Sequence, residues 1–351
     1  MQHARLNSST WLGLVALGLC GACQDGAQAP LTQGSPAALE AHDWSVLLPW
    51  GAGAGEVGLR GTQPDFPGTG VASVAVGPTD GVLLLDRVNQ RVVSAGPKGS
   101  RVLAEVPRDA EDLAVGVDGA FAVHSLLRAR VWLYDGAVKA GELAIDRSLR
   151  ELVGVSVGRS RRVFVHNAFQ ETWLIGSPAA PQSLTQTLHG KRKGAFLLAD
   201  GAGVQVLLAR EPSGTLPAKG HPELLVVRTG ERTRVVARHV LPETVLSARV
   251  VGLAGHVACL RLEEGEHGTT VRVTRRVVCH DVQTGARVFE KSLGARGLYL
   301  PRRDLAVGQS PARLVFIRPE EKGLRVHHWV LPVLPVLPAL PALPTGAEVR
   351  R

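Results

Sequence analysis

Three side chains at matching points of a recurring pattern are the residues best suited to chemistry in this sequence. Asp86, His124 and His166 each follow the second apolar run in one of three successive copies of the pattern. Carboxylate and imidazole groups brought to one point would hold a metal ion or act as acid and base. The alternative is that the aspartate fixes a turn through backbone hydrogen bonds, and that the two histidines are tolerated replacements.

No complete catalytic motif commits the chain to a reaction. There is no glycine-rich phosphate loop, no HExxH and no GxSxG, and the Cys20–Cys23 pair lies in an apolar N-terminal segment. His327 and His328 are neighbours on an expected strand, so their side chains would point to opposite faces. We therefore predict no catalytic residue and no cofactor, and the candidate metal residues remain Asp86, His124 and His166.

The elements that would position these residues come from an internal repeat. An apolar run, a glycine turn and a second apolar run recur about every 40 to 55 residues. Three copies are clear and three are weaker: 71–93, 111–135, 151–176, 194–210, 248–264 and 297–319. Short Val-rich runs with turns between them are typical of strands, and long helical periods are missing. We predict an all-β fold, a β-propeller of six four-stranded blades, with five or seven blades as alternatives.

The two ends of the repeat region are expected to pair. The apolar segment 44–50 precedes the first copy, and segment 323–332 follows the last one. If these segments form adjacent strands, they close the ring and leave no exposed sheet edge between its ends.

The first copies resemble the repeats of NHL-type propellers. The run Gly81–Asp86 and the run Asn89–Val92 reproduce that family's glycine, apolar strand, aspartate, asparagine and Arg-Val pattern. The resemblance implies a closed ring of four-stranded blades, and some six-bladed propellers of this kind bind a metal or a substrate at one face. Segment 277–293 also resembles a repeat of quinone-dependent dehydrogenases. It lacks their docking tryptophan, so Thr284–Gly285 is better interpreted as a hairpin turn.

The N-terminus has the features of an export signal. Arg5 precedes an apolar run of about nine residues, which is too short to span a bilayer. Small residues next to a cysteine resemble a bacterial lipoprotein signal, with Cys23 as the lipidated residue and Cys20 as the alternative. An ordinary secretory signal is the other interpretation.

These features divide the chain into four parts. We expect a signal peptide at 1–22, a flexible tether at 23–42, the propeller at 43–332 and a Leu-Pro-rich tail at 333–351. The tether and the tail are the parts expected to be disordered.

The two remaining cysteines raise the question of a disulfide. Cys259 and Cys279 lie on neighbouring expected strands of an exported protein, where disulfides form. Direct pairing would place residue 263 opposite residue 275 and bring the sulfurs together. A tighter hairpin would keep them apart and leave two buried free thiols.

Charge and composition limit the partners. The formal net charge is +9, but no aromatic residues interleave the basic ones, so we predict no nucleic acid. The prediction is a monomeric, non-enzymatic propeller that binds a protein, peptide or glycan partner. It would be held by its lipid in the cell envelope, with secretion as the alternative. The competing function is an extracytoplasmic propeller enzyme, either a metal-dependent lyase or a lactone or ester hydrolase.

Overall fold

The computed structural model describes most of the repeat region. The described residues are 42–61, 68–78, 81–149, 152–167, 172–181, 195–197, 204–209, 223–228, 234–242, 244–266, 272–295, 297–309 and 312–332. Between residues 195 and 238 only the backbone is described. The chain divides into the units Met1–Glu40 and Ala41–Arg351. The expected signal peptide, nearly all of the tether and the tail lie outside the described residues.

The described strands form six four-stranded antiparallel sheets. The first sheet contains β2 (Val71–Val76), β3 (Val82–Asp86), β4 (Arg91–Gly96) and β5 (Gly99–Glu105). The second contains β6 (Asp112–Val115), β7 (Phe121–Ser125), β8 (Arg130–Asp135) and β9 (Val138–Ala144). The third contains β10 (Leu152–Val157), β11 (Val163–Asn167), β12 (Thr172–Ser177) and β13 (Ala180–Pro181).

The remaining three sheets follow the same plan. The fourth contains β14 (Ala195–Leu197), β15 (Val204–Ala209), β16 (Glu223–Arg228) and β17 (Arg234–Val240). The fifth contains β18 (Val245–Ala254), β19 (Val257–Glu266), β20 (Arg272–Asp281) and β21 (Arg287–Ser292). The sixth contains β22 (Leu305–Gln309), β23 (Ala312–Glu320), β24 (Gly323–Val330) and β1 (Trp44–Pro49).

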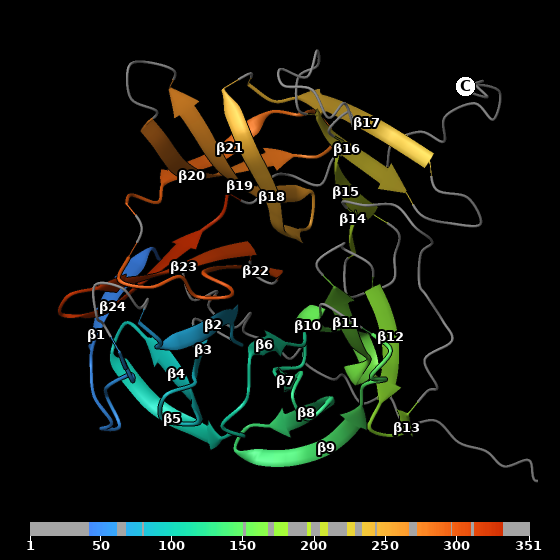
Figure 1. Ribbon diagram of the computed structural model, residues 1–351. Helices are drawn as coiled ribbons and strands as arrows, with labels where there is room; N and C mark the ends of the chain where they lie inside the picture. Colours follow the sequence, from blue (N-terminus) through green and yellow to red (C-terminus); the bar gives the residue numbers. More distant parts are fainter. Residues whose placement is uncertain are drawn as a thin grey trace, which may run out of the picture. The chain divides into compact units, whose positions relative to one another are not determined.

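In Figure 1 the sheets of the unit Ala41–Arg351 are arranged around a centre, with strands such as β2, β6 and β22 facing inward. This is the β-propeller predicted from the repeats, and the all-β class is confirmed. The one described helical element is a short 3₁₀ turn at Arg159–Arg161. Among the described residues, no helix has the length and apolarity needed to cross a membrane.

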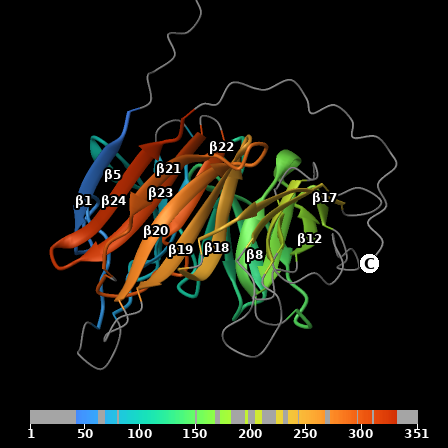
Figure 2. The ribbon, with the colours of Figure 1, turned by 90° about the horizontal axis from the view of Figure 1, so that it is seen from above.

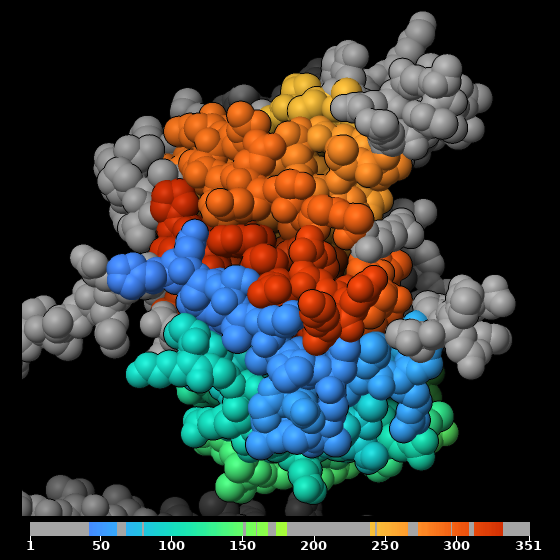
Figure 3. Space-filling model, turned by 90° about the vertical axis from the view of Figure 1, so that its left-hand side faces the viewer, coloured from blue at the N-terminus to red at the C-terminus, as the bar shows by residue number. Residues whose placement is uncertain are grey.

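The first and last strands close the propeller as predicted. β1 pairs antiparallel with β24, so that Trp44 lies opposite His328 and Leu48 opposite Leu324. Figure 3 shows the blue N-terminal atoms lying directly against the red atoms of the last strands, and Figure 2 shows β1 beside β24. The Trp44 indole also stacks on the His328 ring, with centroids 5.0 Å apart.

Apolar side chains between neighbouring sheets form the core. One cluster joins the sixth sheet to the first through Leu48, Val326, Val74 and Leu84. Similar clusters lie between the first and second sheets, the second and third, and the fifth and sixth. Because the first and second sheets bury both faces against their neighbours, β3 and β7 are apolar runs and not alternating strands.

The cysteines of the fifth sheet are joined. Cys259 lies directly opposite Cys279, with their Cα atoms 4.0 Å apart, and a disulfide connects them. Glu263 lies opposite Arg275, which is the register that direct pairing of the cysteines requires. Both cysteines are fully buried.

Candidate functional site

The structure corrects the alignment of the three candidate metal residues. In the three sheets, Val82, Phe121 and Val163 are equivalent because each begins the second strand opposite the end of the first. Counting forward from these residues, Asp86 is the fifth residue of its strand, whereas His124 and His166 are the fourth residues of theirs.

A shift of one residue reverses the side of a strand to which a side chain points. Leu85 is therefore the residue equivalent to the two histidines, and Asp86 is equivalent to Ser125 and Asn167. Equivalent positions in the repeats would have placed the three candidates in one ring around the axis, as a metal or active site requires. Because Asp86 is offset by one residue, they do not form such a ring.

Asp86 is instead fully bonded to the chain around it. Its carboxylate accepts hydrogen bonds from the Gly58 amide (3.1 Å), the Asn89 amide (3.3 Å) and the Asn89 side chain (2.8 Å). Its other buried partner is the Arg91 guanidinium, at 3.1 Å. Ser125 holds the matching turn in the second sheet, where it accepts a hydrogen bond from the Arg128 amide. This arrangement supports the turn-fixing interpretation of Asp86.

The two histidines lie close to the centre but are not ligand-like. His124 is fully buried, and neither ring nitrogen has a hydrogen-bonding partner among the described residues. Burial lowers its pKa, so the ring is neutral near pH 7. His166 Nε2 lies 2.8 Å from Ser156 Oγ, and burial followed by the nearby Arg303 lowers its pKa to about 4.

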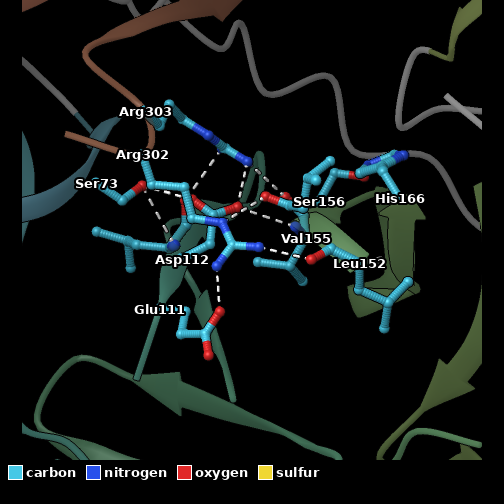
Figure 4. Close-up of polar contacts among 11 residues, drawn as sticks. Ser73, Glu111, Asp112, Leu152, Val155, Ser156, His166, Arg302 and Arg303 are labelled. Atoms are coloured by element: carbon cyan, nitrogen blue, oxygen red, sulfur yellow. Dashed lines mark hydrogen bonds and ion pairs between the residues drawn. The ribbon is translucent and has the colours of Figure 1, made fainter. Parts of the chain in front are cut away.

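Arg303, from the segment that enters the last sheet, acts electrostatically on both histidines, and Figure 4 shows it together with His166. Arg303 immediately precedes Asp304 and β22, and its Nη2 donates to Asp112 Oδ2 at 2.5 Å. It also donates to the carbonyl oxygens of Leu113 and Val155, both at 3.1 Å. Arg303 therefore joins the entry of the sixth sheet to the innermost strands of the second and third.

Asp112 is the buried anion at the centre of this network. Besides Arg303, it accepts hydrogen bonds from Ser73 Oγ at 2.6 Å and from the Val155 amide at 3.0 Å. A Cβ at Gly154 would lie 3.2 Å from both Asp112 Oδ2 and Arg303 Nη2, so a larger residue there would have to displace these side chains slightly. Four innermost strands or their entries, β2, β6, β10 and β22, meet at this carboxylate.

Arg302 makes a second set of bonds next to those of Arg303. Its guanidinium forms an ion pair with Glu111 and donates to the carbonyl oxygens of Val153 (3.0 Å) and Leu152 (2.6 Å). We call Arg302, Arg303, Glu111 and Asp112 the arginine clasp. The clasp links segments about 190 residues apart in the chain.

A cavity of about 750 Å³ opens at this end of the innermost strands. Its walls come from five of the sheets and the segments next to their strands, and Arg302 and Glu111 of the clasp form part of them. The lining residues are Gly68, Thr69, Gly70, Val71, Ala72, Arg87, Glu111, Val153, Asn167, Ala248, Arg249, Tyr299, Leu300, Pro301 and Arg302. Burial raises the pKa of the Tyr299 phenol, which keeps the hydroxyl protonated.

The charges of this axial cavity do not suit a metal cation. Arg87, Arg249 and Arg302 line it with a single carboxylate, Glu111, which is already paired. In the described part of the chain, no group of three or more His, Cys, Asp or Glu side chains has an arrangement that would hold a metal. The donor set therefore does not fit the metal expected for a metal-dependent lyase.

Sequence reasoning missed the arginines of this site. The pair Arg302–Arg303 immediately precedes the apolar run of the last repeat, and Arg249 lies inside the fifth repeat. Two adjacent arginines next to an inner strand were the available signal. In contrast, Thr284–Gly285 is a turn, as interpreted: Asp281 Oδ1 accepts from the Gln283 and Thr284 amides, and Gly285 has a φ of 75°.

Comparison with known proteins gives similarity in fold only. No protein-family model matches the chain, and the comparison with curated sequences gives no match. A streptogramin B lyase structure is similar, with 9% identity, a TM-score of 0.40, and coverage of 77% of this chain and 97% of that one. Virginiamycin B lyase from Staphylococcus aureus has 10% identity, a TM-score of 0.39, and coverage of 83% and 99%.

A gluconolactonase from Xanthomonas campestris is similar to the same extent. It has 12% identity and a TM-score of 0.41, and the alignment covers 80% of this chain and 92% of that one. At these identities the similarity concerns the propeller, not a ligand or a reaction.

Proposed function

We propose that this protein is a ligand-binding β-propeller without enzymatic activity, and that its ligand enters the axial cavity. The observation that carries the proposal is the cavity itself: about 750 Å³, at the inner ends of the strands, lined by three arginines. Concave sites of this size with a few polar groups are the usual ligand sites of proteins. Arg302 and Glu111 of the clasp form part of the cavity wall, and their ion pair and the bonds from Arg302 to two carbonyl oxygens hold them in place.

The non-enzymatic interpretation rests on how the ionisable groups are used. Asp86, Asp112 and Glu111 are all engaged with arginines. A general base must lie within hydrogen-bond reach of the proton that it takes, and these carboxylates are bonded to arginines instead. The cavity offers donors for binding but no free carboxylate or imidazole among its described lining residues.

Blocking the cavity tests the proposal. We suggest ligand-observed NMR with three probe classes, namely small acids, neutral disaccharides and tripeptides. Ala248→Trp should abolish binding of at least one class, because Ala248 lines the cavity. The control is Val117→Trp, at a residue that is 69% exposed and does not line the cavity. If no probe distinguishes the two variants, the axial cavity is not the binding site.

We also propose that the propeller is exported and attached to a membrane through a lipid on Cys23. The support is the apolar N-terminal run and the small residues before this cysteine. Metabolic labelling with palmitate in a bacterial host should mark the full chain, and Cys23→Ser should remove the label and release the protein from the membrane fraction. Loss of the label in Cys20→Ser instead would move the lipid to Cys20, and no label in the wild type would exclude a lipid anchor.

The NHL-type relationship belongs to the same proposal. Its support is the pattern Gly81–Asp86 with Asn89–Val92, together with the turn bonds that Asp86 accepts. A binding role for protein, peptide or glycan partners follows from this proposal and shares its test.

One contact favours a second candidate, an ester or lactone hydrolase. Ser156 Oγ lies 2.8 Å from His166 Nε2, which is the distance of a nucleophile from its base. The lowered pKa of His166 makes it a weak base, and neither residue lines the axial cavity. A fluorophosphonate probe should not label Ser156 if the binding proposal holds. Labelling that disappears in Ser156→Ala would establish the hydrolase.

A further inference from the structure

The arginines around the axial cavity fall into two groups. Arg302 and Arg303 are paired with Glu111 and Asp112, and nearby Arg261 is paired with Asp304 at 2.8 Å. Arg249 and Arg87 also line the cavity, but neither side chain makes a hydrogen bond or an ion pair with any described residue. The guanidinium groups of Arg249 and Arg87 have no partner among the described residues, so they are available to a ligand.

Arg249 is held in an unfavourable electrostatic environment. Burial lowers its pKa, and the Arg303 guanidinium lowers it further. The carboxylates that attract it, Asp304 and Asp112, are already bonded to Arg261 and Arg303. Its side chain nevertheless remains exposed to the water in the cavity. A cation in this situation gains most from an anion that arrives from solution, because no protein carboxylate is free to neutralise it.

The charge of the lining indicates the charge of the ligand. Three arginines and one glutamate give the cavity a formal charge of +2 (3 − 1). Part of the lining is apolar, since it includes Leu300, which is 56% exposed, and its neighbour Pro301. Guanidinium groups recognise carboxylates through two parallel hydrogen bonds, and apolar lining residues suit a carbon skeleton.

We propose that the axial cavity binds a small organic acid carrying two or more carboxylates, with one carboxylate on Arg249. Arg87 and Arg302 supply the remaining positive charge around the cavity. This inference rests on the proposed function, because it names the ligand class of the same cavity. Binding of the dianion relieves the repulsion between Arg249 and Arg303. A ligand that binds only the folded protein therefore raises its free energy of unfolding.

The experiment is a titration of the folded chain with succinate, citrate and inorganic phosphate at constant ionic strength. Succinamide, which has the same skeleton as succinate without its charges, is the neutral control. We expect succinate or citrate to bind and succinamide not to bind. Arg249→Met should weaken carboxylate binding at least about 10-fold, the effect of losing one charge-assisted pair.

Arg101→Met is the matched control variant. Arg101 is an exposed arginine on β5, outside the cavity, so its removal changes the net charge equally without touching the site. Equal weakening by both substitutions would show a general charge effect and overturn the proposal. Circular dichroism of both variants confirms that each is folded before it is titrated.

The outcomes separate the ligand class from the function. If a neutral sugar or peptide binds in a way that Ala248→Trp blocks, while no carboxylate binds, the organic-acid inference is wrong and the binding proposal stands. If phosphate binds more tightly than every carboxylate, the class of the ligand is wrong. If Ala248→Trp leaves carboxylate binding unchanged, both proposals are wrong.

Discussion

Arg303 and Arg249 lie near each other at the same end of the propeller, yet their surroundings are opposite. Arg303 is bonded to a buried carboxylate and two carbonyl oxygens, which come from two other sheets. Arg249 has no such bonds among the described residues, and its neighbour Arg303 repels it. The same type of side chain is therefore bonded within the fold at one position and left without a bonded partner among the described residues at the other.

This difference distinguishes charged side chains that stabilise the fold from those that are available to bind a ligand. A side chain that satisfies all its partners within the protein is explained by the fold. A side chain that is kept charged without a partner lowers stability, and such residues gather where a ligand supplies the missing partner.

The largest effect should come from removing Arg303. Arg303→Met leaves Asp112 buried without its counter-charge, and breaking a buried pair in this way costs roughly 3–5 kcal/mol. Urea unfolding of the variant should show this loss in the free energy of unfolding. The double variant Arg303→Met with Asp112→Leu should recover much of it, and a double variant as unstable as the single one would argue against the pair.

Asp86→Asn should give the next largest effect. The groups around Asp86 are all donors, so an amide nitrogen there faces another donor and Arg91 loses its counter-ion. We expect a loss of about 2–3 kcal/mol in thermal or urea unfolding. Binding to the cavity should be unaffected, because Asp86 does not line it. A variant of full stability that fails to bind would assign Asp86 to the site.

Low pH should weaken the protein through His166. Its pKa is lowered from the ordinary 6.5 to about 4, so below pH 6.5 the unfolded chain takes up a proton that the folded chain refuses. Stability from this group is therefore lost as the pH falls from about 6.5 to about 4, by at most about 3 kcal/mol in all. Asp112, His124 and Arg303 are the charged or titratable groups that act on it.

His166→Gln removes this contribution while an amide can still bond to Ser156. Unfolding measured at pH 7 and pH 4.5 should differ less in the variant than in the wild type. His124 titrates in the same direction because burial also lowers its pKa, so part of the pH dependence should remain. An unchanged difference between the two pH values would show that His166 is not held neutral by the fold.

The smallest effect should be in the salt dependence of Arg249. Added salt screens the repulsion between Arg249 and Arg303, so salt should stabilise the wild type slightly more than Arg249→Met. The expected difference is about 0.5 kcal/mol, because water in the cavity already screens these charges. Salt should stabilise Arg101→Met as much as it stabilises the wild type. If the two variants respond to salt equally, the effect comes from the net charge and not from the contact between Arg249 and Arg303.

The sequence predicted the parts of the fold that depend on local patterns. The repeat spacing predicted the propeller, the resemblance to NHL-type repeats implied its four-stranded blades, and the apolar terminal segments predicted the pairing of β1 with β24. The turn at Thr284–Gly285 followed from residue types alone. Each of these features follows from residue types and from the spacing of apolar runs along the chain.

The site itself was not predictable in the same way. Asp86 was aligned with two histidines that lie one position earlier in their strands, because repeats of similar composition do not fix register to one residue. The partners of Arg302 and Arg303 lie about 190 residues away in the chain. Only the closed ring brings them together, so no local pattern reveals which arginine is paired and which is free.

The most direct test of this contrast compares Arg249→Met with Arg303→Met in the same unfolding experiment, without ligand. We expect the two substitutions to change the free energy of unfolding in opposite directions. Arg303→Met should lower it by roughly 3–5 kcal/mol, and Arg249→Met should raise it by about 0.5 kcal/mol. A loss of more than about 1 kcal/mol in Arg249→Met would be the size of a lost structural hydrogen bond. That result would show that Arg249 stabilises the fold, and it would contradict the account.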